Sequence, residues 1–196
     1  MSTEWKAEEV LAELWAGNRR FQRDEADGPR RDSRRRVSIA GSQSPRAAVV
    51  ACSDSRVPPE LLFDQGLGDL FVVRLAGNVI GRDALGSLEY AVGHLDVPAI
   101  VILGHSRCGA IGAAVRGGHA SDHMGGILDS LRTAIEATAA LPGDAVANAA
   151  REHVRRLVAG LAPRSAVLRA RISEGKLAVV GAYYDLDTGA VERLEP

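Results

Sequence analysis

The chain contains two cysteines, and each lies in a short run with charged or metal-binding side chains. Cys52 belongs to the run Ala-Cys-Ser-Asp-Ser-Arg-Val at 51–57. Cys108 ends the run Gly-His-Ser-Arg-Cys, in which it follows His105 by three residues. Two thiolates and one imidazole provide three zinc ligands and leave one tetrahedral position open, and such a site activates water. A catalytic zinc site is therefore the first hypothesis.

Two simpler interpretations of the cysteines stay open. They can form a disulfide, or they can be small buried hydrophobic residues. The N-terminus is charged and lacks the apolar core of a secretory signal, which disfavours a disulfide. Inert core cysteines leave unexplained why His105 precedes Cys108 and why Asp54 and Arg56 follow Cys52 so closely. The metal site is the preferred interpretation.

Each cysteine run follows an apolar stretch that is typical of a buried strand. Residues 47–51 lead into Cys52, and residues 99–103 lead into His105. Because the carboxyl ends of parallel strands meet at one edge of a sheet, where α/β proteins place their active sites, these side chains should meet. Cys108 would fall in the first turn of the next helix, whose N-terminus favours a thiolate.

The rest of the chain alternates between strand and helix patterns. Strands are predicted at 47–52, 69–75, 99–104 and 176–185, with a turn at Asp187–Gly189 before an edge strand at 190–194. Helices are predicted after Pro58-Pro59, over 84–95, from Gly109 to Val115, and two or three times across 125–172. This order predicts an α/β fold with a central, mostly parallel sheet, four parallel strands plus an edge strand, flanked by helices.

An N-terminal helical arm is predicted ahead of this body. Thr3 can cap a helix that ends near Phe21 and carries an apolar stripe, for which ordinary core packing is one interpretation. Residues 22–46 form a polar connector, and its basic part is expected to be solvated or to contact another subunit. The predicted domains are 1–46, the arm and connector used in dimerisation, and 47–196, the zinc-binding catalytic domain.

Composition limits the function classes. With 196 residues, 46% hydrophobic content and a net charge of −1, the chain suits one ordinary globular domain. Nothing indicates nucleic-acid binding, and no apolar run approaches the ~18 residues of a membrane span. A cytoplasmic location is expected, where reduced thiols suit zinc binding.

The two cysteine runs, in this order, resemble the β-class carbonic anhydrases. Residues 71–78, Phe-Val-Val-Arg-Leu-Ala-Gly-Asn, look like the family's third block, and residues 85–92, Leu-Gly-Ser-Leu-Glu-Tyr-Ala-Val, look like its fourth. The likeness extends from about Gln43 to Ala114. One departure is Leu75, where the family usually has asparagine beside the arginine.

The resemblance implies one zinc ion per chain, held by Cys52, His105 and Cys108. It implies reversible hydration of carbon dioxide to bicarbonate and a proton by a zinc-bound hydroxide. Asp54 would orient the hydroxide and Arg56 would hold Asp54. Asp54 can instead bind the zinc as a fourth ligand, which would close the site.

The resemblance also implies substrate contacts and an assembly. Gln43, nine residues before Cys52, matches the substrate-binding glutamine of the plant-like type. The backbone at Gly109 could donate a hydrogen bond, and Phe71 and Tyr90 match residues that shape an apolar pocket of the neighbouring subunit. The N-terminal helix would extend from the body onto a partner, in a homodimer or a dimer of dimers.

Two other functions fit the same residues. One is hydrolysis of carbonyl sulfide or carbon disulfide, and the other is zinc binding without catalysis. The remaining histidines carry less weight: His94 would complement a helix dipole, His153 would lie on a solvated helix face, and His119 and His123 would lie in a loop.

Overall fold

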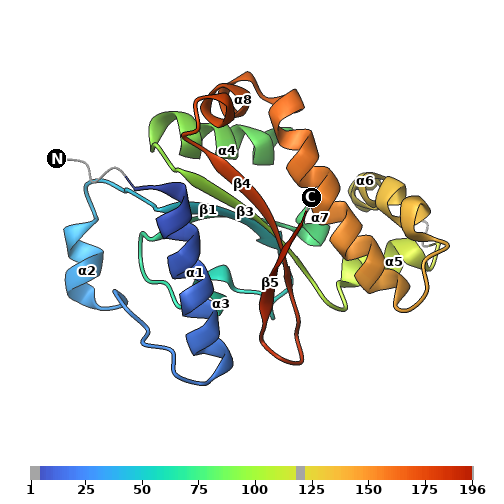
Figure 1. The fold of residues 1–196 in the computed structure, drawn as a ribbon, viewed down its shortest axis with the longest axis horizontal. Helices are drawn as coiled ribbons and strands as arrows, with labels where there is room; N and C mark the ends of the chain where they lie inside the picture. The colour runs from blue at the N-terminus through green and yellow to red at the C-terminus, as the bar shows by residue number, and fades with distance from the viewer. Residues whose placement is uncertain (1–4, 118–121, 196) are drawn as a thin grey trace.

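The computed structural model describes residues 5–117 and 122–195, and its centre is a five-stranded sheet (Figure 1). The strand order is β2-β1-β3-β4-β5. The first four strands run parallel and β5 pairs antiparallel with β4, which confirms the predicted fold class. The strands are β1 (Ala47–Cys52), β2 (Leu70–Leu75), β3 (Ala99–His105), β4 (Ala178–Tyr184) and β5 (Val191–Leu194).

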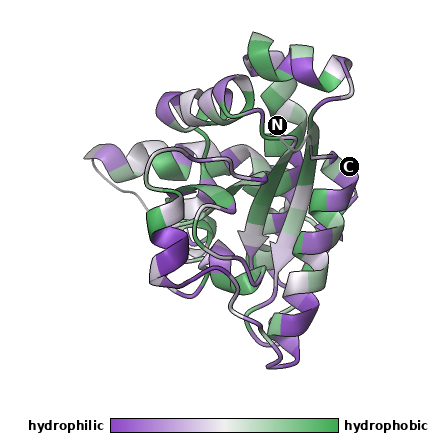
Figure 2. Cartoon of the chain, turned by 90° about the vertical axis from the view of Figure 1, so that its left-hand side faces the viewer, coloured by the Kyte–Doolittle hydropathy of each residue, from purple (hydrophilic) through white to green (hydrophobic). Residues whose placement is uncertain are grey.

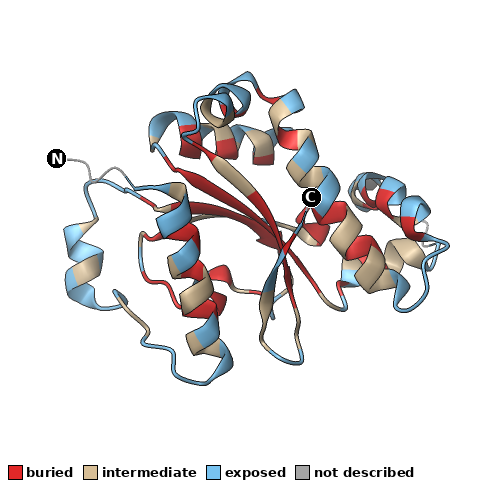
Figure 3. Cartoon of the chain, in the orientation of Figure 1, coloured by how far each residue is buried: buried red, intermediate tan, exposed pale blue. Residues whose placement is uncertain are grey.

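Helices cover both faces of the sheet, as its apolar strands require. Every residue of β1 and β3 is buried, and the middle of the sheet is hydrophobic in Figure 2 and buried in Figure 3. Such continuous burial is typical of parallel strands that are covered on both sides. The helical segments are α1 (Ala7–Gln22), α2 (Ser33–Ser38), α3 (Pro59–Leu62), the 3-10 turn η1 (Ala76–Asn78), α4 (Arg82–His94), α5 (Gly109–Val115), α6 (Asp122–Thr138), α7 (Ala145–Arg164) and α8 (Ala166–Ser173).

The helix α1 packs on the sheet of its own chain. Val10, Leu11 and Leu14 are each at most 3% exposed and belong to one apolar cluster with Val49 and Val101 of the sheet. The expectation that this helix reaches away from the body is therefore wrong. The apolar stripe of α1 packs on one face of the sheet, and α4, α7 and α8 cover the other face. Ordinary core packing therefore accounts for the stripe.

The N-terminal connector is more ordered than its polar sequence predicts. It contains α2, and its basic side chains contact acids of the same chain. Arg30 pairs with Asp69 at 2.7 Å, and Arg31 lies 3.8 Å from Asp64, which is fully buried. These arginines offset buried negative charge within the fold. Thr3, the predicted helix cap, lies outside the described residues.

Two of the histidine expectations are also wrong. His153 is only 4% exposed, because the face of α7 that carries it packs into the core. His123 lies in α6 rather than in a loop, and His119 lies outside the described residues. His94 is in the last turn of α4, as predicted, and its ring stacks on Tyr90 with centroids 5.1 Å apart.

No helix in the described part of the chain combines the length and the apolar character needed to cross a membrane.

Candidate metal centre

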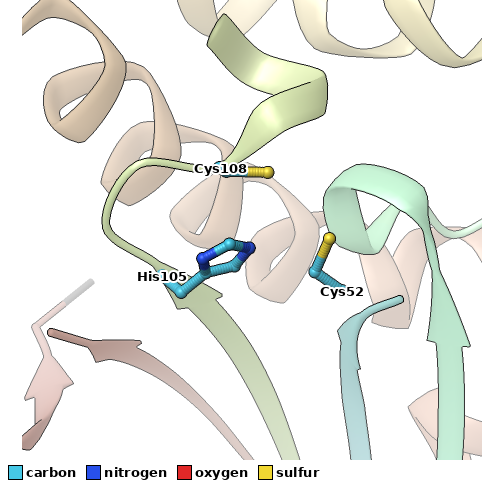
Figure 4. Close-up of side chains that lie close together, drawn as sticks. All are labelled: Cys52, His105 and Cys108. Carbon is cyan, nitrogen blue, oxygen red and sulfur yellow. The ribbon is translucent and has the colours of Figure 1, made fainter. Parts of the chain in front are cut away.

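Cys52, His105 and Cys108 meet at the carboxyl edge of the sheet (Figure 4). Cys52 ends β1, His105 ends the neighbouring parallel strand β3, and Cys108 is the N-cap of α5. All three residues are buried, and their ligand atoms lie within 4.8 Å of one another. The strand ends therefore bring together three residues that are separated by up to 56 positions in sequence.

The hydrogen bonding of His105 leaves one ring nitrogen available for a metal. Its Nδ1 lies 2.9 Å from the backbone oxygen of Ser106, to which it donates, so Nε2 carries the lone pair. Nε2 is buried without a hydrogen-bond partner among the described residues. A buried acceptor without a hydrogen-bond partner lowers the stability of the fold by about 1–3 kcal/mol. A cation at this position would satisfy it, and two sulfurs with one nitrogen fit zinc.

The two thiols differ in protonation. Hydrogen bonding from Cys108 lowers the pKa of Cys52 to about 3 against the opposing effect of burial, and the backbone N–H groups of Asp54 and Gly77 add smaller contributions in the same direction. The adjacent Cys52 thiolate and burial raise the pKa of Cys108. The pKa values of the two thiols are therefore shifted apart, because one sulfur ionises more readily while the other keeps its proton. A divalent cation would favour the second thiolate and release that proton.

Asp54 and Arg56 form a charged pair beside the three candidate ligands. The Arg56 guanidinium donates to both carboxylate oxygens, Nε to Oδ1 at 2.9 Å and Nη2 to Oδ2 at 2.7 Å. These bonds hold the pKa of Asp54 well below its usual range, against the opposing effect of burial. Oδ2 lies 4.0 Å from Nε2 of His105, beyond hydrogen-bonding distance. The carboxylate thus faces the metal position, remains ionised, and is engaged by Arg56.

Arg74 supports the segment that carries both Cys52 and Asp54. It donates to the backbone oxygen of Cys52 at 3.0 Å and to that of Asp54 at 2.6 Å. Its neighbour Leu75, the departure from the family pattern, packs against the core, and its backbone oxygen accepts from Ser53. The leucine therefore leaves the contacts of Arg74 intact.

Gly77 is a second contributor that the sequence pattern does not single out. Its N–H donates to Sγ of Cys52 at 3.3 Å. Its φ of 65° lies in the left-handed region, and a Cβ there would lie 3.3 Å from the side chains of Ala110 and Leu131. A glycine at this place lets the backbone turn its N–H toward the sulfur.

The predicted substrate residues fall into two groups. Gly109 begins α5 directly after Cys108, so its backbone lies next to the ligands. Gln43 is exposed in the coil ahead of β1, whereas Cys52 is at the other end of that strand. Gly109 therefore lies beside the metal-binding residues, and Gln43 lies away from those of its own chain.

Phe71 and Tyr90 are also distant from the ligands of their own chain. Leu75 is the β2 partner of Cys52, and Phe71 precedes it by four residues, which is about 13 Å along a strand. The rings of Phe71 and Tyr90 lie 6.2 Å apart between centroids. Together with residues of α4 they line a shallow hollow of about 570 Å³, and Tyr90 is 44% exposed there.

Comparison with known sequences gives consistent matches. The family model described as carbonic anhydrase matches residues 47–191. Carbonic anhydrase 2 of Mycobacterium tuberculosis is 41% identical over 189 residues, which cover 94% of this chain and 88% of the relative. The carbonic anhydrase of Mycolicibacterium smegmatis is 40% identical over 192 residues, which cover 96% and 90%.

Solved structures match the fold as well. The β-carbonic anhydrase CcaA superposes with a TM-score of 0.75 at 26% identity, over 94% of this chain and 95% of that one. A chain from the crystal structures of two tetrameric β-carbonic anhydrases of Sordaria macrospora gives a TM-score of 0.73 at 27% identity, over 96% and 95%.

Proposed function

The chain belongs to the β-carbonic anhydrase family, and on that premise we propose that it is a zinc enzyme for the reversible hydration of carbon dioxide to bicarbonate and a proton. The observation that carries the proposal is the buried Cys52–His105–Cys108 set beside the Asp54–Arg56 pair, in which Nε2 of His105 has no hydrogen-bond partner within the part of the chain that the structure describes. We assign the enzyme to the cytoplasm, where its free thiols stay reduced.

The three ligands define what the metal would contribute. Zinc held by the two Sγ atoms and Nε2 would act as a Lewis acid that lowers the pKa of a water in its open position. Two thiolates offset the whole charge of the ion, so little of that charge is left to favour ionisation of the water. Arg56 supplies a further positive charge beside the site.

Asp54 orients the nucleophile in this proposal. Its ionised carboxylate accepts the hydrogen of the attacking oxygen and so directs a lone pair at the carbon of carbon dioxide. Arg56 fixes the plane of the carboxylate through two parallel hydrogen bonds. His105 keeps Nε2 directed at the metal position, because Nδ1 is bound to the Ser106 oxygen.

We further propose that each active site is completed by a neighbouring copy of the chain. Gln43, Phe71 and Tyr90 lie away from their own metal ligands, so in this proposal they serve the site of a partner. A homodimer or a dimer of dimers provides that geometry, and tetrameric relatives exist. No nucleic acid or membrane partner is proposed.

The test is stopped-flow hydration of carbon dioxide on protein with measured zinc content. We expect activity that is proportional to bound zinc, that disappears on chelation and that returns when zinc is restored. Parallel assays with carbonyl sulfide and carbon disulfide separate the rival hydrolase function. Stoichiometric zinc without turnover of any of the three substrates would contradict the proposal and indicate a non-catalytic zinc protein.

A further inference from the structure

The loop between His105 and Cys108 is fastened to the turn that joins β4 to β5. The Ser106 N–H donates to the backbone oxygen of Tyr184 at 2.9 Å, and the Ser106 hydroxyl accepts from Leu186 N–H at 2.9 Å. The Arg107 guanidinium donates to both carboxylate oxygens of Asp187, at 3.0 and 2.8 Å. Two successive residues of the ligand loop are therefore bound to a segment 80 positions away.

The turn itself is preorganised to present Asp187. Oδ1 of Asp185 accepts from the N–H groups of Asp187 and Thr188 and from the Thr188 hydroxyl, at 2.9–3.0 Å. Gly189, at φ 72°, closes the turn with a 2.9 Å bond to the Asp185 oxygen. The carboxylate of Asp187 thus stands on a rigid support, although the side chain is 70% exposed.

Arg107 has a backbone conformation that such a support would stabilise. Its φ is 52°, in the left-handed region that non-glycine residues seldom adopt. In this conformation its backbone oxygen accepts from Nη2 of Arg56 at 3.3 Å. The same Nη2 donates to Oδ2 of Asp54 at 2.7 Å. One guanidinium nitrogen therefore connects the ligand loop to the carboxylate beside the metal position.

We propose that Arg107 is a positioning residue, held by Asp187 in the left-handed conformation so that its carbonyl keeps Arg56 against Asp54. The inference rests on the proposed function of the Asp54–Arg56 pair. This contact adds to the Asp54 pairing of a guanidinium whose side chain is 50% exposed and which has, among the described residues, hydrogen bonds to Asp54 and Arg107. The β4–β5 turn then influences the orientation of the Asp54 carboxylate through Arg107 and Arg56.

The alternative is that Arg107 and Asp187 form an ordinary surface ion pair without a positioning role, because exposed ion pairs contribute little to stability. Two substitutions of Arg107 distinguish the interpretations. Arg107→Ala removes the tether and leaves a residue that avoids positive φ, whereas Arg107→Gly removes the same tether but adopts positive φ readily. A positioning role therefore predicts that glycine rescues part of the loss that alanine causes. An ion pair alone predicts no advantage for glycine.

The kinetic experiment compares Arg107→Ala, Arg107→Gly and Asp187→Ala with Arg132→Ala. Arg132 pairs with Asp129 at a similarly exposed place on α6 and serves as the matched control. We expect kcat to fall about 10-fold for Arg107→Ala, as for other residues that support metal-site groups, with KM and zinc content nearly unchanged. Arg107→Gly should lie between this variant and the wild type, and the Arg132→Ala control should match the wild type.

A double substitution tests whether Arg107 and Asp187 act together. Adding Asp187→Ala to Arg107→Ala should cause no further loss, because both changes break the same tether. Equal kcat values for the alanine and glycine variants, or additive losses in the double variant, would overturn the proposal.

A spectroscopic measurement tests the inference independently of turnover. The visible spectrum of protein loaded with cobalt(II) reports the ligands of the ion. If Arg107→Ala releases Asp54, the carboxylate can approach the ion, because Oδ2 already lies 4.0 Å from Nε2 of His105. We expect a changed spectrum in Arg107→Ala, and no such change when Asp54→Asn is added. Spectra that are identical for wild type and Arg107→Ala would refute the inference even if the proposed activity were absent.

Discussion

Cys108 is the proposed ligand whose loss should be easiest to interpret. It caps α5 and is buried, so replacement by alanine deletes one sulfur without removing a helix-capping hydrogen bond. We expect Cys108→Ala to lose zinc and activity together, and to be less stable than the zinc-loaded wild type because metal binding contributes to folding. Elemental analysis and stopped-flow assays check this expectation. Full zinc occupancy in the variant would show that Cys108 is not a ligand.

Asp54 should be dispensable for zinc but not for turnover. An asparagine at this position presents an NH₂ group to Arg56 in place of one acceptor, which breaks the pair of parallel hydrogen bonds. We expect Asp54→Asn to keep one zinc per chain and to lose about 10–100-fold in kcat. Asp129→Asn, on an exposed helix face, is the control. Wild-type turnover in Asp54→Asn would remove Asp54 from the mechanism.

His153 should make stability depend on pH. Burial lowers its pKa from 6.5 to about 4. Above pH 6.5 the residue is neutral in both states. Between pH 6.5 and pH 4 the histidine is protonated in the unfolded chain and stays neutral in the folded chain. The free energy of unfolding therefore falls as the pH drops through this range, by at most about 3 kcal/mol.

The variant His153→Leu isolates this effect of pH. Urea unfolding of wild type and His153→Leu at pH 7.5, 5.5 and 4.5 should give a difference that shifts in favour of the leucine variant as the pH falls. Groups that titrate in both proteins, including the metal ligands, cancel in that difference. A difference that stays constant with pH would mean that His153 keeps an ordinary pKa.

At the scale of elements, Asn18 fastens α1 to two distant segments. The side chain is 1% exposed; Nδ2 donates to the oxygens of Leu62 and Gly189 at 3.0 Å, and Oδ1 accepts from Val191 N–H at 2.9 Å. Asn18→Ala leaves these backbone groups without their partner and should lower the free energy of unfolding by about 2–4 kcal/mol. Urea unfolding measures the change.

The control for Asn18 is Asn148, an asparagine whose side chain makes fewer and more exposed hydrogen bonds among the described residues. Its side-chain Nδ2 donates an exposed hydrogen bond to the Pro142 oxygen at 3.1 Å. Asn148→Ala should cost at most about 1 kcal/mol. Similar losses for the two variants would show that the Asn18 contacts add nothing special.

The sheet was predictable because its strands are continuous apolar runs bounded by turn residues. The β4–β5 hairpin followed from the turn signal at 187–189. α2 was missed because five of its six residues are polar and the single Val37 gives no apolar periodicity. The extension of α1 onto a partner was inferred from the family resemblance and is wrong, whereas ordinary core packing, the other interpretation of the stripe, is what the structure has. The stripe alone could not decide between them, because it indicates that a helix packs on some surface and does not say which chain supplies it.

The sequence predicted those residues of the candidate metal centre that act through their side chains. Thiol, imidazole and carboxylate groups indicate a metal site through their types and spacing, and the resemblance to a family added the substrate residues. Arg107 and Gly77 could not be found in this way. Each contributes a backbone carbonyl or N–H, which almost every residue possesses, so only the folded geometry reveals the contact.

At the scale of the whole molecule, shared active sites predict complementation between inactive variants. Cys108→Ala destroys the metal centre of its own chain, whereas Tyr90→Ala, in the proposed assembly, damages the site of its partner. Mixed dimers of the two variants would contain one intact site. Unfolding and refolding a 1:1 mixture should therefore restore about a quarter of the wild-type activity. Activity that never exceeds the sum of the separate variants would indicate that each chain forms its site alone.

The contact between Asn18 and Val191 also constrains how the protein is made. The two residues are 173 positions apart, so α1 leaves the ribosome long before its anchor exists. At bacterial and eukaryotic elongation rates this interval is on the order of 10 s. During that time β1 and β3 can emerge and pair, but the hairpin that secures α1 is still missing. The apolar stripe of α1 can therefore pack on β1 and β3 first, and the hydrogen bonds of Asn18 to the β4–β5 segment form only once residues 189–191 have emerged.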